Sequence, residues 1–422
     1  MLDLKFIREN SENVKQNILN KNEKTSEVVE QIIDVDSKRR ANLLEVEQLK
    51  NVRNVVSNEI AMLKRQKENA DDKIQAMKEC SDRIKILDDE LREIEQELFN
   101  LQLKIPNMVH SSVPIGKTAD DNLEVRNWGS PKVDGNYKDH LTISKELNIL
   151  DFERGAKVTG AGFAYYIGKG AKLERSLINY MLDLHIEKHG YTELIPPLVV
   201  NRNSMVGTGQ IPKLAEDMYY IEKDDLYLIP TAEVPLTNFF SNDILKAEDI
   251  PTKVCGFTQC FRREAGSYGK DTRGFLRVHQ FNKVELVKLC LPEESYNELE
   301  LLVADVEEIL QALQIPYRVL SLCSGDTSFS SAKTYDLECW SPAEKKWLEC
   351  SSCSNFEDFQ ARRAAIRFKR TPSSKPEFVH TLNGSGLATS RLIVSIIEQY
   401  YENGRIRVPD VLVPYCGFEY IG

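Results

Sequence analysis

Residues 258–287 bring together charged side chains whose types suit the binding of phosphate and carboxylate groups. Arg262, Glu264 and Arg277 lie there in a charged stretch that also carries glycines. A guanidinium is permanently charged and fork-shaped, so it holds two oxygens of a phosphate or a carboxylate at once. The same residues would also suit a solvated edge hairpin with ordinary surface ion pairs. Residue types alone leave both interpretations open.

The two ends of this stretch predict the strands of an antiparallel hairpin. Residues 254–262 and 278–287 are rich in β-branched, aromatic and other apolar residues, as strands are. By period-two geometry Arg277, His279 and Phe281 share one face, and so do Lys283 and Glu285. The loop between the strands holds Arg262, Arg263, Glu264, Gly266, Gly269, Lys270, Asp271, Arg273, Gly274 and Arg277.

Two other segments combine polar side chains with turn or helix signals. In LIPTAEVPLTN, residues 228–238, Thr231 and Glu233 could converge on one ammonium group, or Thr231 could cap a helix whose first turn contains Glu233. Residues 382–400 predict a glycine turn followed by an apolar helix. The amides at a helix N-terminus favour phosphate. The glycine loop GTGQIPK, residues 207–213, lacks the Gly-Lys-Ser/Thr of a P-loop.

The segment WLECSSCSN, residues 347–355, contains a Cys-x-x-Cys spacing that could indicate zinc or redox chemistry. Alternation along a strand would place Cys350 and Cys353 on opposite faces, and the sequence has no second Cys-x-x-Cys. We therefore do not expect a zinc site.

Composition limits the class of protein. The chain has 422 residues, 41% of them hydrophobic, which is enough for two or more domains with a sizeable core. Its net charge of −10 argues against a wholly basic coat for nucleic acid. No apolar run approaches the ~18 residues that span a bilayer, and MLDLKFIREN has no apolar signal-peptide core. The nine irregularly spaced cysteines suggest reduced cytosolic thiols.

The first 110 residues differ in composition from the rest of the chain: they contain no glycine and a single proline, Pro106. Unbroken 3-4 spacing of apolar residues predicts one long helix, and the same spacing with Arg53 as its polar member predicts another. The seams are Met77, Cys80, Ile84, Leu87, Leu91, Ile94, Leu98 and Leu101, and Val46, Leu49, Arg53, Val56, Ile60 and Leu63. A polar break at residues 65–72 predicts an antiparallel hairpin of two helices, each about 30 residues and so about 45 Å long.

This helical arm could bind RNA or another protein chain. Residues 50–85 hold nine Lys/Arg against six Asp/Glu, a net charge of +3 that could meet phosphates. A dimerising or protein-binding coiled coil is the plainer interpretation of the residues. A shorter apolar pattern over residues 2–19 predicts a preceding helix that buries Phe6, Val14 and Ile18.

Between the arm and the charged hairpin the signals are weaker. Residues 107–135 are rich in turn residues and are expected to form a linker. Residues 140–150 predict a short helix, and residues 151–166 a short strand or hairpin. An amphipathic helix over residues 171–189 and a strand over 191–195 follow.

Taken together, these segments resemble the seryl-tRNA synthetases of bacterial and eukaryotic type. FRREAG, RGFLRVHQF and KVE resemble motif 2 of the class II aminoacyl-tRNA synthetases, the helix and strand over 171–195 resemble motif 1, and GSGLATSR resembles motif 3. The resemblance covers nearly the whole chain. It implies an α+β fold, with a tRNA-binding coiled-coil hairpin (1–110), a linker (111–135) and a class II catalytic domain on an antiparallel sheet flanked by helices (136–422).

The resemblance also implies roles for individual residues. Arg262, Arg277 and Arg391 would be the catalytic cations, with Arg262 bridging the amino-acid carboxylate and the α-phosphate of ATP. Glu349 and Ser352 would bind Mg²⁺. The serine-binding residues would be Thr231, Ala232, Glu233, Arg262, Glu285, Asn383 and Ser385. The ATP-binding residues would be Arg262, Arg263, Glu264, Arg277, Val278, Phe281, Glu349, Cys350, Ser351, Ser352 and Arg391.

The activity that the resemblance implies is serine–tRNA ligation in two steps, through seryl-adenylate. The expected partners are ATP, tRNA(Ser), tRNA(Sec) and a second copy of the chain, and the expected location is the cytoplasm. Two alternatives remain: a relative that activates an amino acid for a carrier protein, and a coiled-coil scaffold with an inactive domain. The helical arm argues against the first, and the joint presence of Arg262, Glu264, Glu285, Glu349 and Arg391 argues against the second.

Overall fold

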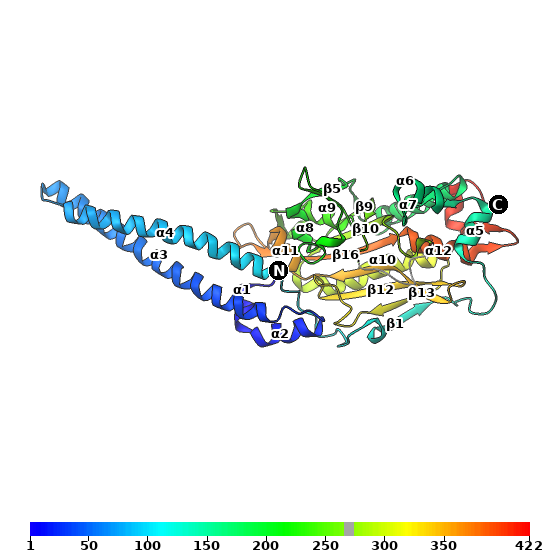
Figure 1. The fold of residues 1–422 in the computed structure, drawn as a ribbon, viewed down its shortest axis with the longest axis horizontal. Coiled ribbons are helices and arrows are strands. Elements are labelled where there is room, and N and C mark those ends of the chain that lie inside the picture. The colour runs from blue at the N-terminus through cyan, green and yellow to red at the C-terminus, as the bar shows by residue number, and fades with distance from the viewer. Residues whose placement is uncertain (266–273) are drawn as a thin grey trace. The chain divides into compact units, whose positions relative to one another are not determined.

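The computed structural model describes residues 1–265 and 274–422, so the predicted loop residues Gly266, Gly269, Lys270, Asp271 and Arg273 lie outside the described part. The chain forms two compact units, Met1–Pro106 and Asn107–Gly422 (Figure 1).

The first unit is entirely helical. Its elements are α1 (Leu4–Glu9), α2 (Ser11–Asn20), α3 (Glu27–Gln66) and α4 (Asp71–Gln102). The reversal between α3 and α4 falls inside the predicted break, with Lys67 in the left-handed conformation at φ 63°. The predicted seam residues are buried or half-buried; those that are buried are Val46, Ile60, Ile84, Leu87, Leu98 and Leu101.

Two sequence expectations for this unit need correction. α3 is 40 residues long because its first half has a buried stripe of its own, including Val28, Val29 and Ile32. In α1 it is Ile7 that is buried, whereas Phe6 remains 36% exposed. Both residues lie in the first apolar pattern, and its spacing did not distinguish between them.

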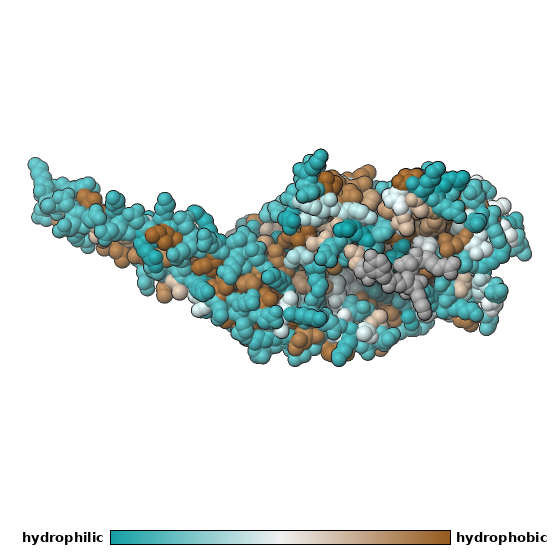
Figure 2. Space-filling view, in the orientation of Figure 1, coloured by the Kyte–Doolittle hydropathy of each residue, from teal (hydrophilic) through white to brown (hydrophobic). Residues whose placement is uncertain are grey.

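Charged side chains cover the outside of the hairpin, and the space-filling view shows a largely hydrophilic surface there (Figure 2). Lys50 pairs with Asp88 at 3.4 Å across the two helices. Near the reversal Lys64, Arg65 and Lys78 are exposed and have no ion-pair partner within the described residues.

The second unit is organised around an eight-stranded sheet in the order β1-β11-β12-β13-β16-β10-β9-β4. Its pairs are antiparallel except β4 with β9. The strands are β1 (Leu123–Trp128), β4 (Thr192–Glu193), β9 (Thr252–Phe261), β10 (Gln280–Cys290), β11 (Tyr317–Ser321), β12 (Lys333–Ser341), β13 (Lys346–Asn355) and β16 (His380–Ala388). Strands β9 and β10 form the predicted antiparallel hairpin. The expected linker, residues 111–135, contains strand β1 and is therefore partly a sheet element.

Three helices supply much of the core that packs on this sheet: α7 (Lys169–Glu187), α10 (Ser295–Ala312) and α12 (Thr389–Tyr400). Leu177, Val303 and Ile396 are fully buried in this core cluster. The remaining helices are α5 (His140–Leu147), α6 (Phe152–Thr159), α8 (Arg202–Thr208), α9 (Glu233–Asn238), α11 (Phe359–Ala364) and α13 (Val413–Cys416).

Short strands form small sheets around this framework. They are β2 (Leu150–Asp151), β3 (Tyr165–Tyr166), β5 (Val199–Asn201), β6 (Tyr220–Ile221), β7 (Leu226–Leu228), β8 (Ile244–Lys246), β14 (Arg367–Lys369), β15 (Glu377–Phe378), β17 (Tyr401–Glu402), β18 (Arg405–Arg407) and β19 (Tyr420–Ile421). No helix in the described parts of the chain is long and apolar enough to cross a membrane.

Two local predictions differ from the structure. Residues 151–166, expected as a strand or hairpin, contain α6 between the two-residue strands β2 and β3. The segment NGSG, expected as a glycine turn, lies inside strand β16, where a Cβ on Gly384 would come within 2.9 Å of the Cys353 sulfur. The glycines there allow close packing, and the helix begins only at Thr389.

Candidate active site

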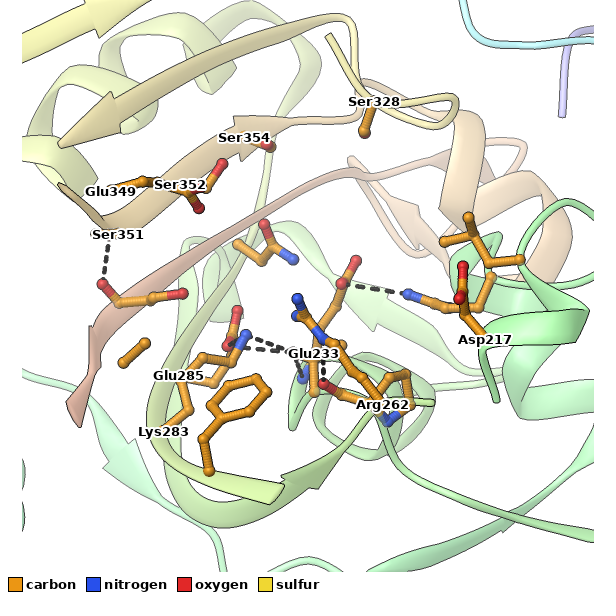
Figure 3. A pocket seen from close by; sticks show the side chains of 18 of the residues that line it. Asp217, Glu233, Arg262, Lys283, Glu285, Ser328, Glu349, Ser351, Ser352 and Ser354 are labelled. Carbon is orange, nitrogen blue, oxygen red and sulfur yellow. Dashed lines mark hydrogen bonds and ion pairs between the residues drawn. The ribbon is translucent and has the colours of Figure 1, made fainter. Parts of the chain in front are cut away.

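A cavity of about 870 Å³ is lined by residues of strands β10, β13 and β16 and of the segments around them (Figure 3). Most residues expected to bind serine or ATP line it together. They are Thr231, Glu233, Arg262, Glu264, Arg277, Val278, Phe281, Glu285, Glu349, Cys350, Ser351, Ser352, Asn383, Ser385 and Arg391. Arg263 and Ala232 are not among the described lining residues. The side chain of Ala232 is fully buried in a neighbouring core cluster.

The floor of the cavity is set by the register of three adjacent strands. Glu285 on β10 lies opposite Gly256 on β9 and opposite Ser385 on β16. Asn383 is two residues before Ser385 on the same strand and also lines the cavity. The Glu285 carboxyl is thus buried beside the hydroxyl and amide groups with which the sequence associated it.

A buried lysine, which the sequence did not single out, completes this floor. Lys283 forms an ion pair with Oε2 of Glu285, and its Nζ donates to the Thr231 hydroxyl at 2.8 Å. The same hydroxyl accepts from the Glu233 backbone N–H at 3.1 Å and donates to Glu285 Oε2 at 3.2 Å. A hydroxyl has one donor and two acceptor positions. Both lone pairs of the Thr231 hydroxyl are thus engaged by protein donors in this structure, and its contact with the substrate ammonium remains a prediction.

The carboxyl of Glu233 lies in a buried amide network. Gln360 Nε2 donates to Glu233 Oε1 at 2.6 Å and Gln210 Nε2 donates to Oε2 at 3.4 Å. Burial and repulsion by Glu285 raise the pKa of Glu233 to about 7, while the Gln360 hydrogen bond opposes this rise. The sequence analysis did not predict either glutamine as a site residue, although Gln210 lies in the GTGQIPK loop. Their position beside Glu233 depends on contacts between distant segments.

Two arginines line the cavity between strands β9 and β10. The guanidinium of Arg262 lies 5.1 Å from the ring centroid of Phe281 and donates to the Pro230 carbonyl at 3.3 Å. Arg277 is paired with Glu264 at 2.7 Å. His279, expected to share the face of Arg277 and Phe281, is not among the described lining residues and stacks on Phe163 instead. The reason is that β10 begins only at Gln280, so the alternation does not extend back to it.

Strand β13 supplies oxygen ligands from one face because of a β-bulge. Glu349 pairs with Glu338 and Ser351 pairs with Leu337, so Cys350 is one residue in excess. Ser352 pairs with Asp336, two residues from Glu338, and therefore shares a face with Glu349. The alternation argument that separated Cys350 from Cys353 fails for the same reason, and both thiols are buried in the same core cluster.

The donor set around this bulge fits a hard divalent cation. Glu349 offers a carboxylate and Ser352 a hydroxyl, the oxygen ligands that Mg²⁺ prefers when phosphates complete its shell. Opposite Ser352 on β12, the half-buried Asp336 has one buried oxygen, Oδ1, without a hydrogen-bond partner in the described structure. Arg391 on α12 lies close by, paired with Glu349 at 3.0 Å.

Comparisons with known proteins agree along the whole chain. The family model of the seryl-tRNA synthetase N-terminal domain matches residues 1–109, and that of the class II tRNA synthetase core domain (G, H, P, S and T) matches residues 218–400. A serine–tRNA ligase of Chloroherpeton thalassium is 57% identical, with all of both chains covered.

Two solved structures share the fold. The seryl-tRNA synthetase of Pyrococcus horikoshii complexed with ATP superposes with a TM-score of 0.94 at 39% identity, covering 100% of this chain and 99% of that one. The cytoplasmic serine–tRNA ligase of Naegleria fowleri in complex with AMP gives 0.87 at 31% identity, covering 100% and 98%.

Proposed function

The chain belongs to the seryl-tRNA synthetases, and from this premise we propose how its pocket activates serine. The protein is a class II aminoacyl-tRNA synthetase that joins serine to tRNA with ATP as a substrate. The finer proposal has two steps. The serine carboxylate attacks the α-phosphorus, forming seryl-adenylate and releasing pyrophosphate; a hydroxyl of the terminal adenosine of the tRNA then attacks the seryl carbonyl carbon, forming the ester and releasing AMP. The observation that carries it is the meeting of Glu233, Glu285 and Arg262 in one buried corner of the cavity.

At the amino-acid end, Glu233 holds the substrate ammonium as a carboxylate fixed by Gln360. Glu285, with Asn383 and Ser385, holds the hydroxyl. Thr231 contributes by fixing Glu285. A site built to bond a substrate hydroxyl rejects an analogue that lacks it by about 10⁴–10⁵, because its buried polar groups are left unpaired.

At the nucleotide end, Phe281 stacks on adenine, Glu264 contacts its amine, and Arg277 and Arg391 hold the triphosphate. Both of these arginines are paired with carboxylates, so the phosphates compete with Glu264 and Glu349 for them. Glu349 and Ser352 would hold Mg²⁺, which would neutralise part of the phosphate charge. Arg262 spans the serine carboxylate and the α-phosphate. Positioning and charge neutralisation suffice for this reaction, so no general base is assigned.

The helical arm is the proposed tRNA-binding element, with tRNA(Ser) and tRNA(Sec) as its ligands. Its exposed Lys64, Arg65 and Lys78 offer cations to the phosphate backbone. A homodimer with tRNA bound across the two subunits, and a cytoplasmic location, complete the proposal. The free cysteines of the described residues agree with a reducing compartment.

Pyrophosphate exchange dependent on serine, followed by aminoacylation, tests the function. Exchange with serine and transfer to tRNA(Ser) transcripts is the expected result, and a tRNA(Sec) transcript tests the second acceptor. Exchange without transfer would indicate a carrier ligase, and no exchange would indicate an inactive scaffold. Either result would overturn the proposal.

A further inference from the structure

Lys283 is a buried cation on the cavity floor with no role in the reaction described above. Its side chain is 7% exposed, and it occupies the strand position two residues before Glu285. A charged lysine is buried only where partners compensate its lost hydration. Here those partners are Glu285 and Thr231, both of which line the serine end of the cavity.

The two carboxylate oxygens of Glu285 differ in their contacts with the protein. The ion pair with Lys283 and the bond from the Thr231 hydroxyl both fall on Oε2. Within the described residues no protein donor is recorded on Oε1, which leaves that oxygen for a ligand. Two bonds to one oxygen also fix the plane of the carboxylate, because Thr231 is itself held by the Glu233 backbone N–H.

The charge of Lys283 also favours the ionised form of Glu285, in which both carboxylate oxygens are acceptors. Burial raises the pKa of Glu285, and the attraction of Lys283 is the strongest effect that lowers it again. The other charged groups that act on it are Arg262, which favours the carboxylate, and Glu233, which opposes it. An ionised carboxyl is an acceptor only, whereas a protonated one carries a donor on one of its oxygens.

We propose that Lys283 is a specificity-determining residue, which fixes Glu285 as an ionised acceptor aimed at the substrate hydroxyl and so sets the preference for serine over alanine. This inference rests on the proposed function. Lys283 acts through Glu285 and is a positioning residue, so its removal should change discrimination between the two amino acids more than it changes ATP binding.

The test uses Lys283→Met in the full-length protein, since methionine is unbranched, apolar and of similar length. The affinities of seryl- and alanyl-sulfamoyl adenosine are measured by calorimetry. The dissociation constant of the alanyl analogue divided by that of the seryl analogue should fall about 10- to 150-fold, the value of one hydrogen bond to a charged group. The KM for ATP should stay within about twofold.

Lys288→Met is the matched control. Lys288 is a fully buried lysine on the same strand, paired with Glu298 at 2.9 Å, and it is not among the described lining residues. This variant should keep the wild-type ratio. An unchanged ratio in Lys283→Met, or an equal fall in both variants, would overturn the proposal, because the effect would then be absent or a general loosening of β10.

A second comparison decides the matter if Lys283→Met does not fold. In Glu285→Gln the acceptor cannot be ionised, so the added Lys283→Met change in the double variant should leave the ratio as it is in Glu285→Gln alone. The double variant leaves neither charge of the pair unpaired. A further fall in the ratio would show that Lys283 acts independently of Glu285 and would overturn the proposal. Wild-type protein that does not prefer the seryl analogue would instead refute the proposed function.

Discussion

Replacing Gln360 by leucine should weaken serine binding and shift its dependence on pH. The amide of Gln360 donates to Glu233 Oε1 at 2.6 Å and to the Thr208 carbonyl at 3.1 Å, and it accepts from the Thr381 hydroxyl at 2.8 Å. Leucine fills a similar volume but provides none of these bonds. Glu233 then keeps only the longer bond from Gln210, at 3.4 Å, as its amide donor.

The size of the effect follows from the lost bond. A hydrogen bond to a charged group contributes about 1.5–3 kcal/mol, and 1.4 kcal/mol is a factor of ten, so serine KM should rise about 10- to 150-fold near neutral pH. In the wild type the pKa of Glu233 is about 7, so ammonium binding is strong above pH 7 and falls as the carboxyl is protonated below it. Loss of the Gln360 bond raises this pKa further. The midpoint of the pH profile should therefore move upward by about 1 to 2 pH units.

The assay is pyrophosphate exchange at 25 °C over pH 6 to 9, with serine varied at saturating ATP. Gln399→Leu is the matched control: Gln399 is also buried, and its amide donates to the Trp340 carbonyl at 3.1 Å, outside the described cavity lining. Its serine KM should match the wild type. A folded Gln360→Leu protein with wild-type KM and pH midpoint would refute the argument that Gln360 keeps Glu233 ionised.

Three further predictions concern the nucleotide end and the arm. Arg262→Ala should lower kcat/KM for exchange at least about a hundredfold with little change in Tm, since its recorded protein hydrogen bond is to one carbonyl; near-normal exchange would contradict its assignment. Glu349→Ala should raise the Mg²⁺ concentration needed for half-maximal exchange, and an unchanged Mg²⁺ titration would exclude it as a ligand. Replacing Lys64, Arg65 and Lys78 together by glutamate should raise the KM for tRNA(Ser) at least about tenfold and leave pyrophosphate exchange unchanged. Unaffected aminoacylation would show that these three residues do not contact the tRNA.

The parts that the sequence predicts well are those governed by local periodicity. The seams of α3 and α4 follow from their 3-4 spacing, and β9 and β10 from two apolar runs around a charged loop. The residues of the cavity were predicted mainly through motif resemblance. No periodicity indicates that strands so distant in sequence as β10 and β16 become neighbours.

What the sequence did not reveal depends on tertiary contacts. Lys283 sits in a strand face that also suits a solvated ion pair, and only the positions of Thr231 and Glu285 show that it is buried. Gln360 lies far along the chain from Glu233, on α11. The reach of the period-two pattern was also overestimated, because neither the start of β10 nor the extra residue in β13 has a signal in residue types.

The bulge at Cys350 allows β13 to contain one extra residue while Glu349 and Ser352 stay on the cavity face. Upstream of it the cavity face is occupied by Glu349, and downstream by Ser352, so the two halves of the strand are out of phase by one position. Replacing Cys350 keeps this offset, whereas removing it would restore unbroken alternation, with Glu349, Ser351 and Ser352 opposite the same partners on β12 and on the same faces as before. The extra residue therefore sets the local bend and twist of β13, and with them the separation of Glu349 and Ser352, and leaves the choice of cavity-facing side chains unchanged.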